Sequence, residues 1–265
     1  MKINIKLIGN VFGIAMFAIA SAAYAAGTDI LHLTLHDTMT NSGLETNAVG
    51  TVNLTQNVQG KTDKQLLSLQ LAGLTASNNY ILFAGILDTN VTTVANFSTD
   101  GNGTASFQFG QPGKGKDSNN IPIPDVLNPL RNVWTLAIGT ITTNLLSFTT
   151  NVVLGADFAA STNFQILVKR TIVTNSIPGV TNGVPASISL KANPLMARFV
   201  MSASHLEPST SYIFAVNDTF ETNVSSTASG RVTISANPDP TQVLGVHSVA
   251  LWDSASNVVL RTTLP

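Results

Sequence analysis

An internal duplication constrains the fold of this chain more than any other feature of its sequence. Residues Leu67–Phe107 include LSLQLAGLTASNNYILF and later DGNGTASF, and residues Phe199–Ile234 include FVMSASHLEPSTSYIFA and later TASGRVTI. Four positions align without a gap: Leu69, Leu74, Tyr80 and Ile81 fall on Met201, Leu206, Tyr212 and Ile213. Both copies are built from short runs in which apolar and polar residues alternate, the pattern of half-buried strands.

The duplication covers most of the chain, and matching segments follow one another in the same order in both copies. Ile30–Asp37 opens the first copy and Phe164–Thr171 the second, while Gly50–Leu54 matches Ala186–Leu190. Turn-forming residues separate the runs, and no stretch keeps an apolar period of 3.6 residues. We therefore predict an all-β fold with two tandem homologous β-sandwich or barrel-like units after a signal peptide. The alternative is one large sandwich to which each copy contributes half.

The first residues have the pattern of a secretory signal peptide. Lys2 and Lys6 precede an apolar run from Leu7 to Ala20, and Ala23–Ala25 has small residues where cleavage occurs. Asn10 interrupts the run, which is shorter than the roughly 20 apolar residues of a membrane-spanning helix. We expect cleavage after Ala25, with Ala26 as the near alternative, and export to the periplasm, the cell surface or the extracellular space.

The alternating runs also suggest domain boundaries in the exported chain. We predict a first β unit over residues 27–151, a linker of small residues over 152–161, and a second β unit over 162–265. The longest irregular piece is Gln111–Pro129, which is rich in proline and has no counterpart of similar length in the second copy. We expect no membrane span after the signal peptide.

The composition narrows the chemistry available to the protein. There is no cysteine, so stability must come from burial of a core, and thiol catalysis and thiolate metal sites are excluded. Without the two signal-peptide lysines, the 13 basic residues become 11 against 14 acidic ones, a net charge near −3. No basic face is implied, so we expect no nucleic-acid partner. A bacterial exported protein fits this composition.

A short motif resembles a known structural element. Leu206-Glu207-Pro208-Ser-Thr-Ser-Tyr212 has the spacing of the tyrosine corner in fibronectin type III and immunoglobulin-like modules, and Leu74–Tyr80 keeps the spacing without the proline. The resemblance implies that the Tyr hydroxyl bonds back to the backbone of the turn. The whole repeat is similar to β-sandwich modules repeated in exported bacterial proteins, a resemblance that carries no activity.

Ionisable residues form no recognisable catalytic or metal-binding set. His32 and His36 share one strand face but stand roughly 13 Å apart at about 3.3 Å per residue, so we interpret them as a solvated surface. Asp100–Thr104 could begin a calcium loop, but it continues into no further acidic ligand, and we interpret it as the turn of a hairpin. We therefore assign no catalytic, metal-ligating or cofactor-binding residue.

The sequence leaves three functions open. We favour a non-enzymatic protein with a structural, surface or matrix-associated role, whose candidate partners are polysaccharides or further copies of itself. The second is an extracellular carbohydrate-type binding module that uses Trp134 or Trp252 to stack on a sugar ring, together with the Gln111–Pro129 loop. The third is a secreted hydrolase.

Overall fold

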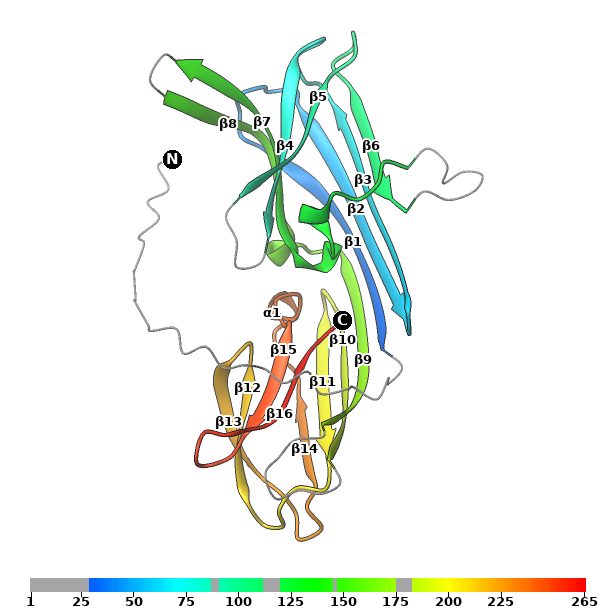
Figure 1. Ribbon diagram of the computed structural model, residues 1–265. Helices are drawn as coiled ribbons and strands as arrows, with labels where there is room; N and C mark the ends of the chain where they lie inside the picture. Colours follow the sequence, from blue (N-terminus) through cyan, green and yellow to red (C-terminus); the bar gives the residue numbers. More distant parts are fainter. Residues whose placement is uncertain (1–28, 87–90, 112–119, 145–146, 175–182) are drawn as a thin grey trace.

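The computed structural model describes residues 29–86, 91–111, 120–144, 147–174 and 183–265, and in these residues the fold is all-β, as predicted (Figure 1). The predicted signal peptide and residues 112–119 of the Gln111–Pro129 loop lie outside them. The first eight strands are β1 (Ile30–Asn41), β2 (Val49–Gln59), β3 (Thr62–Ala72), β4 (Asn79–Ile86), β5 (Thr92–Ser98), β6 (Ala105–Gly110), β7 (Val133–Asn144) and β8 (Ser147–Asp157). The next eight are β9 (Phe164–Thr174), β10 (Val184–Asn193), β11 (Met196–Ala203), β12 (Ser211–Val216), β13 (Thr219–Ser225), β14 (Val232–Ala236), β15 (Ser248–Trp252) and β16 (Val258–Thr263). Short helical turns are η2 (Asp125–Leu127), η3 (Leu130–Asn132), η4 (Phe158–Ala160) and α1 (Pro240–Val243).

Strand β1 forms because its residues alternate in polarity. Leu31, Leu33 and Leu35 are buried, while the intervening His32 and His36 are exposed. Successive side chains of a strand point to opposite faces, so this alternation gives one apolar and one polar face. Strand β4 instead buries three consecutive residues, as predicted for a strand covered on both sides.

One antiparallel sheet runs through both copies of the repeat. Its strand order is β6-β3-β2-β1-β9-β10-β11-β14, and the joint is the pairing of β1 with β9 from Ile30↔Lys169 to Leu35↔Phe164. Each half of this sheet contains equivalent strands in the same order from the joint outward. Because the copies share a sheet, the predicted separation into two tandem units is not confirmed.

Two four-stranded sheets complete the fold, one in each copy. The first has the order β5-β4-β7-β8 and joins β1 where Thr40 and Asn41 pair with β8. The second has the matching order β13-β12-β15-β16. Figure 1 shows these two groups of strands at opposite ends of the molecule, with α1 and the C-terminus between them.

Two local predictions were wrong. Val152–Asp157, expected in a linker, belongs to β8 and pairs with β7, so the sheet continues through the first part of that segment. Asp100–Thr104 does not close a hairpin: β5 pairs with β4 and β6 pairs with β3. The chain does turn at Asp100–Thr104, but the turn connects a strand of one sheet to a strand of the other.

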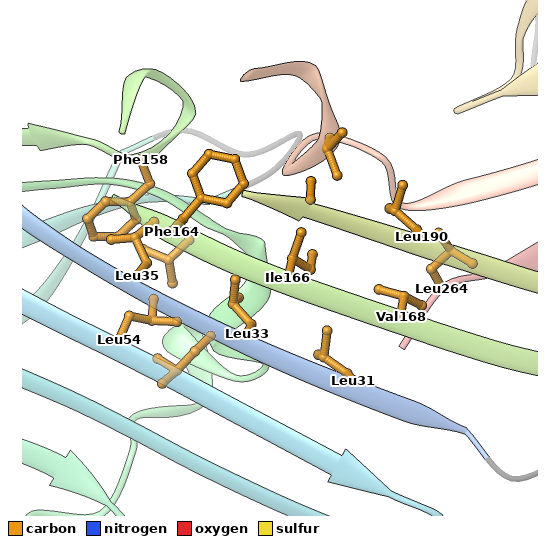
Figure 2. Close-up of a cluster of buried hydrophobic side chains, with 14 of the residues drawn as sticks. Leu31, Leu33, Leu35, Leu54, Phe158, Phe164, Ile166, Val168, Leu190 and Leu264 are labelled. Carbon is orange, nitrogen blue, oxygen red and sulfur yellow. The ribbon is translucent and has the colours of Figure 1, made fainter. Parts of the chain in front are cut away.

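A single cluster of buried apolar residues extends through both copies. At the joint, the cross-strand partners Leu33 and Ile166 are both buried, as are Leu31 and Val168. Figure 2 shows these side chains beside Leu190 and Leu264, so the C-terminal end of the chain helps to cover the joint. Burial of each such side chain is worth roughly 1.5–3 kcal/mol. In the part of the chain that the structure describes, no helix has the length and apolar character needed to cross a membrane.

Candidate functional site

The tyrosine corner is present in both copies. The hydroxyl of Tyr212 accepts a hydrogen bond from the backbone N–H of Glu207 at 3.0 Å, and the hydroxyl of Tyr80 accepts one from the N–H of Thr75 at 3.0 Å. The bond implied by the resemblance is therefore confirmed in each. Burial raises the pKa of Tyr212, while a hydrogen bond from the N–H of Glu207 acts in the opposite direction.

Each corner is closed by a glycine that the duplication preserves. Gly230 has a φ of +69° and its carbonyl accepts from the N–H of Leu206 at 3.0 Å; Gly103 has a φ of +73° and holds Leu74 in the same way at 3.1 Å. A Cβ on either glycine would lie within about 2.2 Å of a backbone oxygen. The duplicated motif is therefore an element of the scaffold.

A cavity lies where the two copies meet. Its volume is about 360 Å³, and its apolar lining includes Leu33 and Leu35 of β1, Leu54 of β2 and Phe158 of η4. Its polar lining comes from Arg131 of η3 and from three residues of the second copy: Asn217, Thr241 and Gln242. The cavity therefore combines an aliphatic floor from the shared sheet with a small number of polar groups, as small-molecule sites do.

Two buried glutamines hold η3 against the sheet. Gln56 on β2 accepts a hydrogen bond from the N–H of Arg131 at 2.9 Å, and Gln65 on β3 accepts one from the N–H of Leu130 at 2.7 Å. Both glutamines also donate to Asp63. Because these side chains are almost fully buried, their hydrogen bonds place the backbone of η3, and with it Arg131, beside the cavity.

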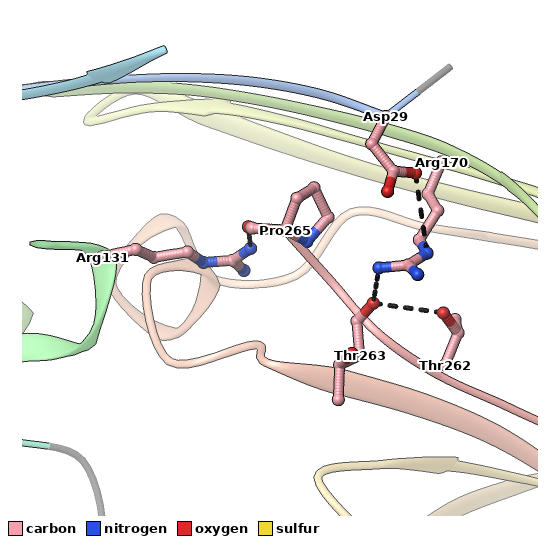
Figure 3. A network of polar contacts seen from close by, with 6 residues as sticks. All are labelled: Asp29, Arg131, Arg170, Thr262, Thr263 and Pro265. Carbon is pink, nitrogen blue, oxygen red and sulfur yellow. Dashed lines mark hydrogen bonds and ion pairs between the residues drawn. The ribbon is translucent and has the colours of Figure 1, made fainter. Parts of the chain in front are cut away.

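Arg131 is a buried cation that links the two copies. Its side chain crosses to the C-terminal part of the chain, where Nη1 donates to the main-chain oxygen of Pro265, the last residue, and Nη2 donates to the carbonyl of Val246. Figure 3 shows Arg131 beside Pro265. Its Nε has no hydrogen-bond partner. Burial lowers the pKa of Arg131 to about 10, so the guanidinium stays charged at neutral pH.

The ion pairs among the described residues do not include Arg131. They join Arg170 to Asp29 at 3.6 Å and Arg261 to Asp218. In Figure 3 the Arg170 pair lies apart from Arg131, and Arg170 also donates to the carbonyl of Thr263. No Asp or Glu side chain within the described part of the chain therefore pairs with Arg131.

The structure places the two candidate tryptophans differently. Trp134 on β7 is half-buried, lines the cavity and stacks on His247, with ring centroids 6.2 Å apart and planes 24° from parallel. Trp252 is half-buried at the end of β15, between Ile213 and Val258, and does not line the cavity. The sequence predicted one cavity residue, Trp134, and did not identify Arg131, whose signal was a lone charged residue between the apolar Leu130 and Val133.

The other ionisable candidates lie on the surface. His32 bonds to Asn57 at 2.8 Å and His36 bonds to Asn53, both on the exposed face of the shared sheet. Asp100 accepts hydrogen bonds from the residues of its own turn, which lower its pKa. No three His, Asp or Glu side chains of the described ranges gather into a metal-binding group.

Comparisons with models of known protein families, with curated proteins and with solved structures find no match to this chain.

Proposed function

We propose that this chain is an exported, non-enzymatic β protein with a structural role at the cell surface or in an extracellular matrix. The observation that supports this role is the joint between the copies, in which six residue pairs connect β1 to β9. Bending at this joint would break backbone hydrogen bonds and expose buried leucines. Domains connected by a linker alone move independently, whereas a shared sheet transmits force from one copy to the other.

Free strand edges provide a means of assembly. Strand β13 pairs only with β12 among the described strands, and all of its residues except Val224 are exposed, including Phe220 at 57%. An edge of this kind presents unpaired backbone groups to another strand. We propose that copies of this chain associate through β13.

Light scattering over a range of protein concentrations tests this role. We expect assemblies that grow with concentration and are lost in Phe220→Lys, because a charge on an edge strand opposes pairing. Leu195→Lys is the matched control, since Leu195 is an exposed apolar residue on the turn between β10 and β11 and lies on no strand. Particles of constant monomer mass at every concentration would contradict assembly.

Ligand binding is the second candidate function, and the cavity at the joint supports it. The half-buried ring of Trp134 gives this cavity an aromatic wall of the kind that packs on a sugar ring. A polysaccharide pull-down tests the carbohydrate form of the proposal. Trp134→Ala should abolish retention, whereas Trp252→Ala should preserve it, and equal losses in the two variants would argue against the cavity.

A further inference from the structure

We propose that the cavity between the two copies binds a small amphipathic carboxylate, whose apolar part lies on the leucine floor and whose carboxylate faces the guanidinium of Arg131. This inference deepens the second candidate function and rests on it, but it replaces the sugar with a different ligand class.

The cavity has the size and lining for an apolar ligand of modest length. Its volume of about 360 Å³ equals that of on the order of a dozen water molecules at about 30 Å³ each. The floor is formed by Leu33, Leu35 and Leu54, which project from adjacent strands of the shared sheet. Such a surface offers dispersion contacts and hydrophobic burial and few hydrogen bonds, so it favours an alkyl chain or an aromatic ring over a sugar.

Arg131 supplies the group that would select a carboxylate. Its side chain is only 6% exposed, it lines the cavity, and its Nε has no hydrogen-bond partner. A guanidinium has five N–H donors in a fixed planar arrangement that matches the two oxygens of a carboxylate. Nη1 donates to the main-chain oxygen of Pro265 and Nη2 to the carbonyl of Val246, and the remaining N–H groups are left for an anion.

Arg131 is also a buried cation to which no Asp or Glu side chain of the described residues is paired. Buried charges in proteins are usually paired, because removing an ion from water is costly. The carbonyl of Val246 and the main-chain oxygen of Pro265, the last residue of the sequence, solvate Arg131 in part. A bound carboxylate would be attracted to the guanidinium inside a low-dielectric site, where the attraction between charges is strong.

The other walls of the cavity suit such a ligand. Trp134 forms an aromatic side wall held by its stacking on His247, and Thr241 and Gln242 of α1 are exposed. A ligand can therefore lie with its chain against the sheet and against Trp134. A bound ligand would change the environment of the Trp134 indole and therefore its fluorescence emission, which reports binding directly.

The probe is sodium decanoate, titrated into Trp252→Phe protein while tryptophan fluorescence is followed. The chain contains two tryptophans, so this variant leaves Trp134 as the only reporter. We expect a saturable change and an affinity at least about tenfold higher for decanoate than for decanol, because a charge-assisted hydrogen bond is worth more than a neutral one. Decylamine, with the same chain and the opposite charge, should bind most weakly.

Two variants separate the carboxylate contact from the apolar contact. Arg131→Met keeps much of the side-chain volume and removes the charge, and it should lower the affinity ratio of decanoate to decanol from at least about tenfold to about one. Ala159→Leu places extra volume in the lining of the cavity and should weaken both probes together. Circular dichroism checks that both variants fold. If either variant fails to fold, the comparison of decanoate, decanol and decylamine in the Trp252→Phe protein still tests the proposal.

The possible results separate the role of Arg131, the existence of the site and the class of ligand. Equal affinities for decanoate and decanol would overturn the role of Arg131, and the absence of saturable binding by any of the three probes would overturn the site. Retention on a polysaccharide without a response to decanoate would refute the carboxylate ligand alone. Absence of both would also refute the ligand-binding function on which the inference rests.

Discussion

Replacing Tyr80 by Phe tests how the tyrosine corner stabilises the fold. The Tyr80 hydroxyl donates to Oε1 of Glu45 at 2.6 Å and accepts from the N–H of Thr75 at 3.0 Å. That N–H also bonds to Oε2 of Glu45 at 2.8 Å and keeps this partner in the variant. The main loss is therefore the bond to a charged acceptor, which is worth about 1.5–3 kcal/mol.

The second copy of the repeat provides the matched control. Within the described ranges, the Tyr212 hydroxyl accepts one hydrogen bond, from the N–H of Glu207, and bonds to no carboxylate. Water can reach this N–H in Tyr212→Phe because Glu207 is exposed, so we expect a cost of about 0.5–1.5 kcal/mol. Tyr80→Phe should therefore lower the free energy of unfolding by about 1 kcal/mol more than Tyr212→Phe does.

Urea unfolding followed by circular dichroism measures both variants. In the Glu45→Gln background the acceptor is neutral, so Tyr80→Phe should cost about as much as Tyr212→Phe. The reasoning would be refuted if the two tyrosine variants had equal costs in the natural background, or if Glu45→Gln left the cost of Tyr80→Phe unchanged.

Three further changes test other parts of the structure, each by urea unfolding. Gly230→Ala should lower the free energy of unfolding by at least about 2 kcal/mol, because its Cβ would lie 2.2 Å from the carbonyl oxygen of Leu206 and its φ is positive. Gln56→Leu should cost about 1–3 kcal/mol, since it leaves the buried N–H of Arg131 without its acceptor. Hydrogen bonds from its own turn lower the pKa of Asp253 below the ordinary value of 3.8. The ionised carboxylate therefore contributes to the free energy of unfolding above pH 3.8, and this contribution is lost as the pH falls through the lowered pKa. Asp253→Asn should weaken the dependence of stability on acid pH.

The equivalent turn of the first copy provides the control for Gly230→Ala. Gly101→Ala should be close to neutral, because a Cβ there meets nothing within 4 Å. A loss in Gly101→Ala as large as in Gly230→Ala would contradict the steric argument. Unchanged stability in Gln56→Leu would show that η3 is held in another way, and an unaltered acid profile in Asp253→Asn would remove this carboxylate from the acid response.

Local patterns in the sequence predicted the strands well but not their partners. The alternation around Leu33 identifies its buried face, because side-chain direction in a strand repeats every two residues. The turn at Asp100–Thr104 was also readable, yet β6 joins β3 and not β5. A turn motif specifies that the chain reverses, whereas the sheet that the next strand enters depends on where distant apolar faces can be buried together.

The candidate site was predictable only in part. Trp134 was selected for its residue type, and the structure places it in the lining of the cavity, whereas Trp252 lies elsewhere. Arg131 could not be recognised as buried, because arginine is normally exposed and its environment comes from Gln56 and from carbonyls more than 100 residues away. Its position depends on how the C-terminal part of the chain packs against η3.

The sequence by itself shows the duplication, including the repeated spacing from Leu to Tyr and the paired glycines. This duplication determines the strands and both tyrosine corners. These features depend on neighbouring residues, so each copy specifies them independently. The joint between β1 and β9, the cavity beside it and the burial of Arg131 arise only when the two copies meet. The physical reason is that backbone hydrogen bonding can pair any two strands of suitable length, and the choice of β9 for β1 depends on the burial of leucines from both.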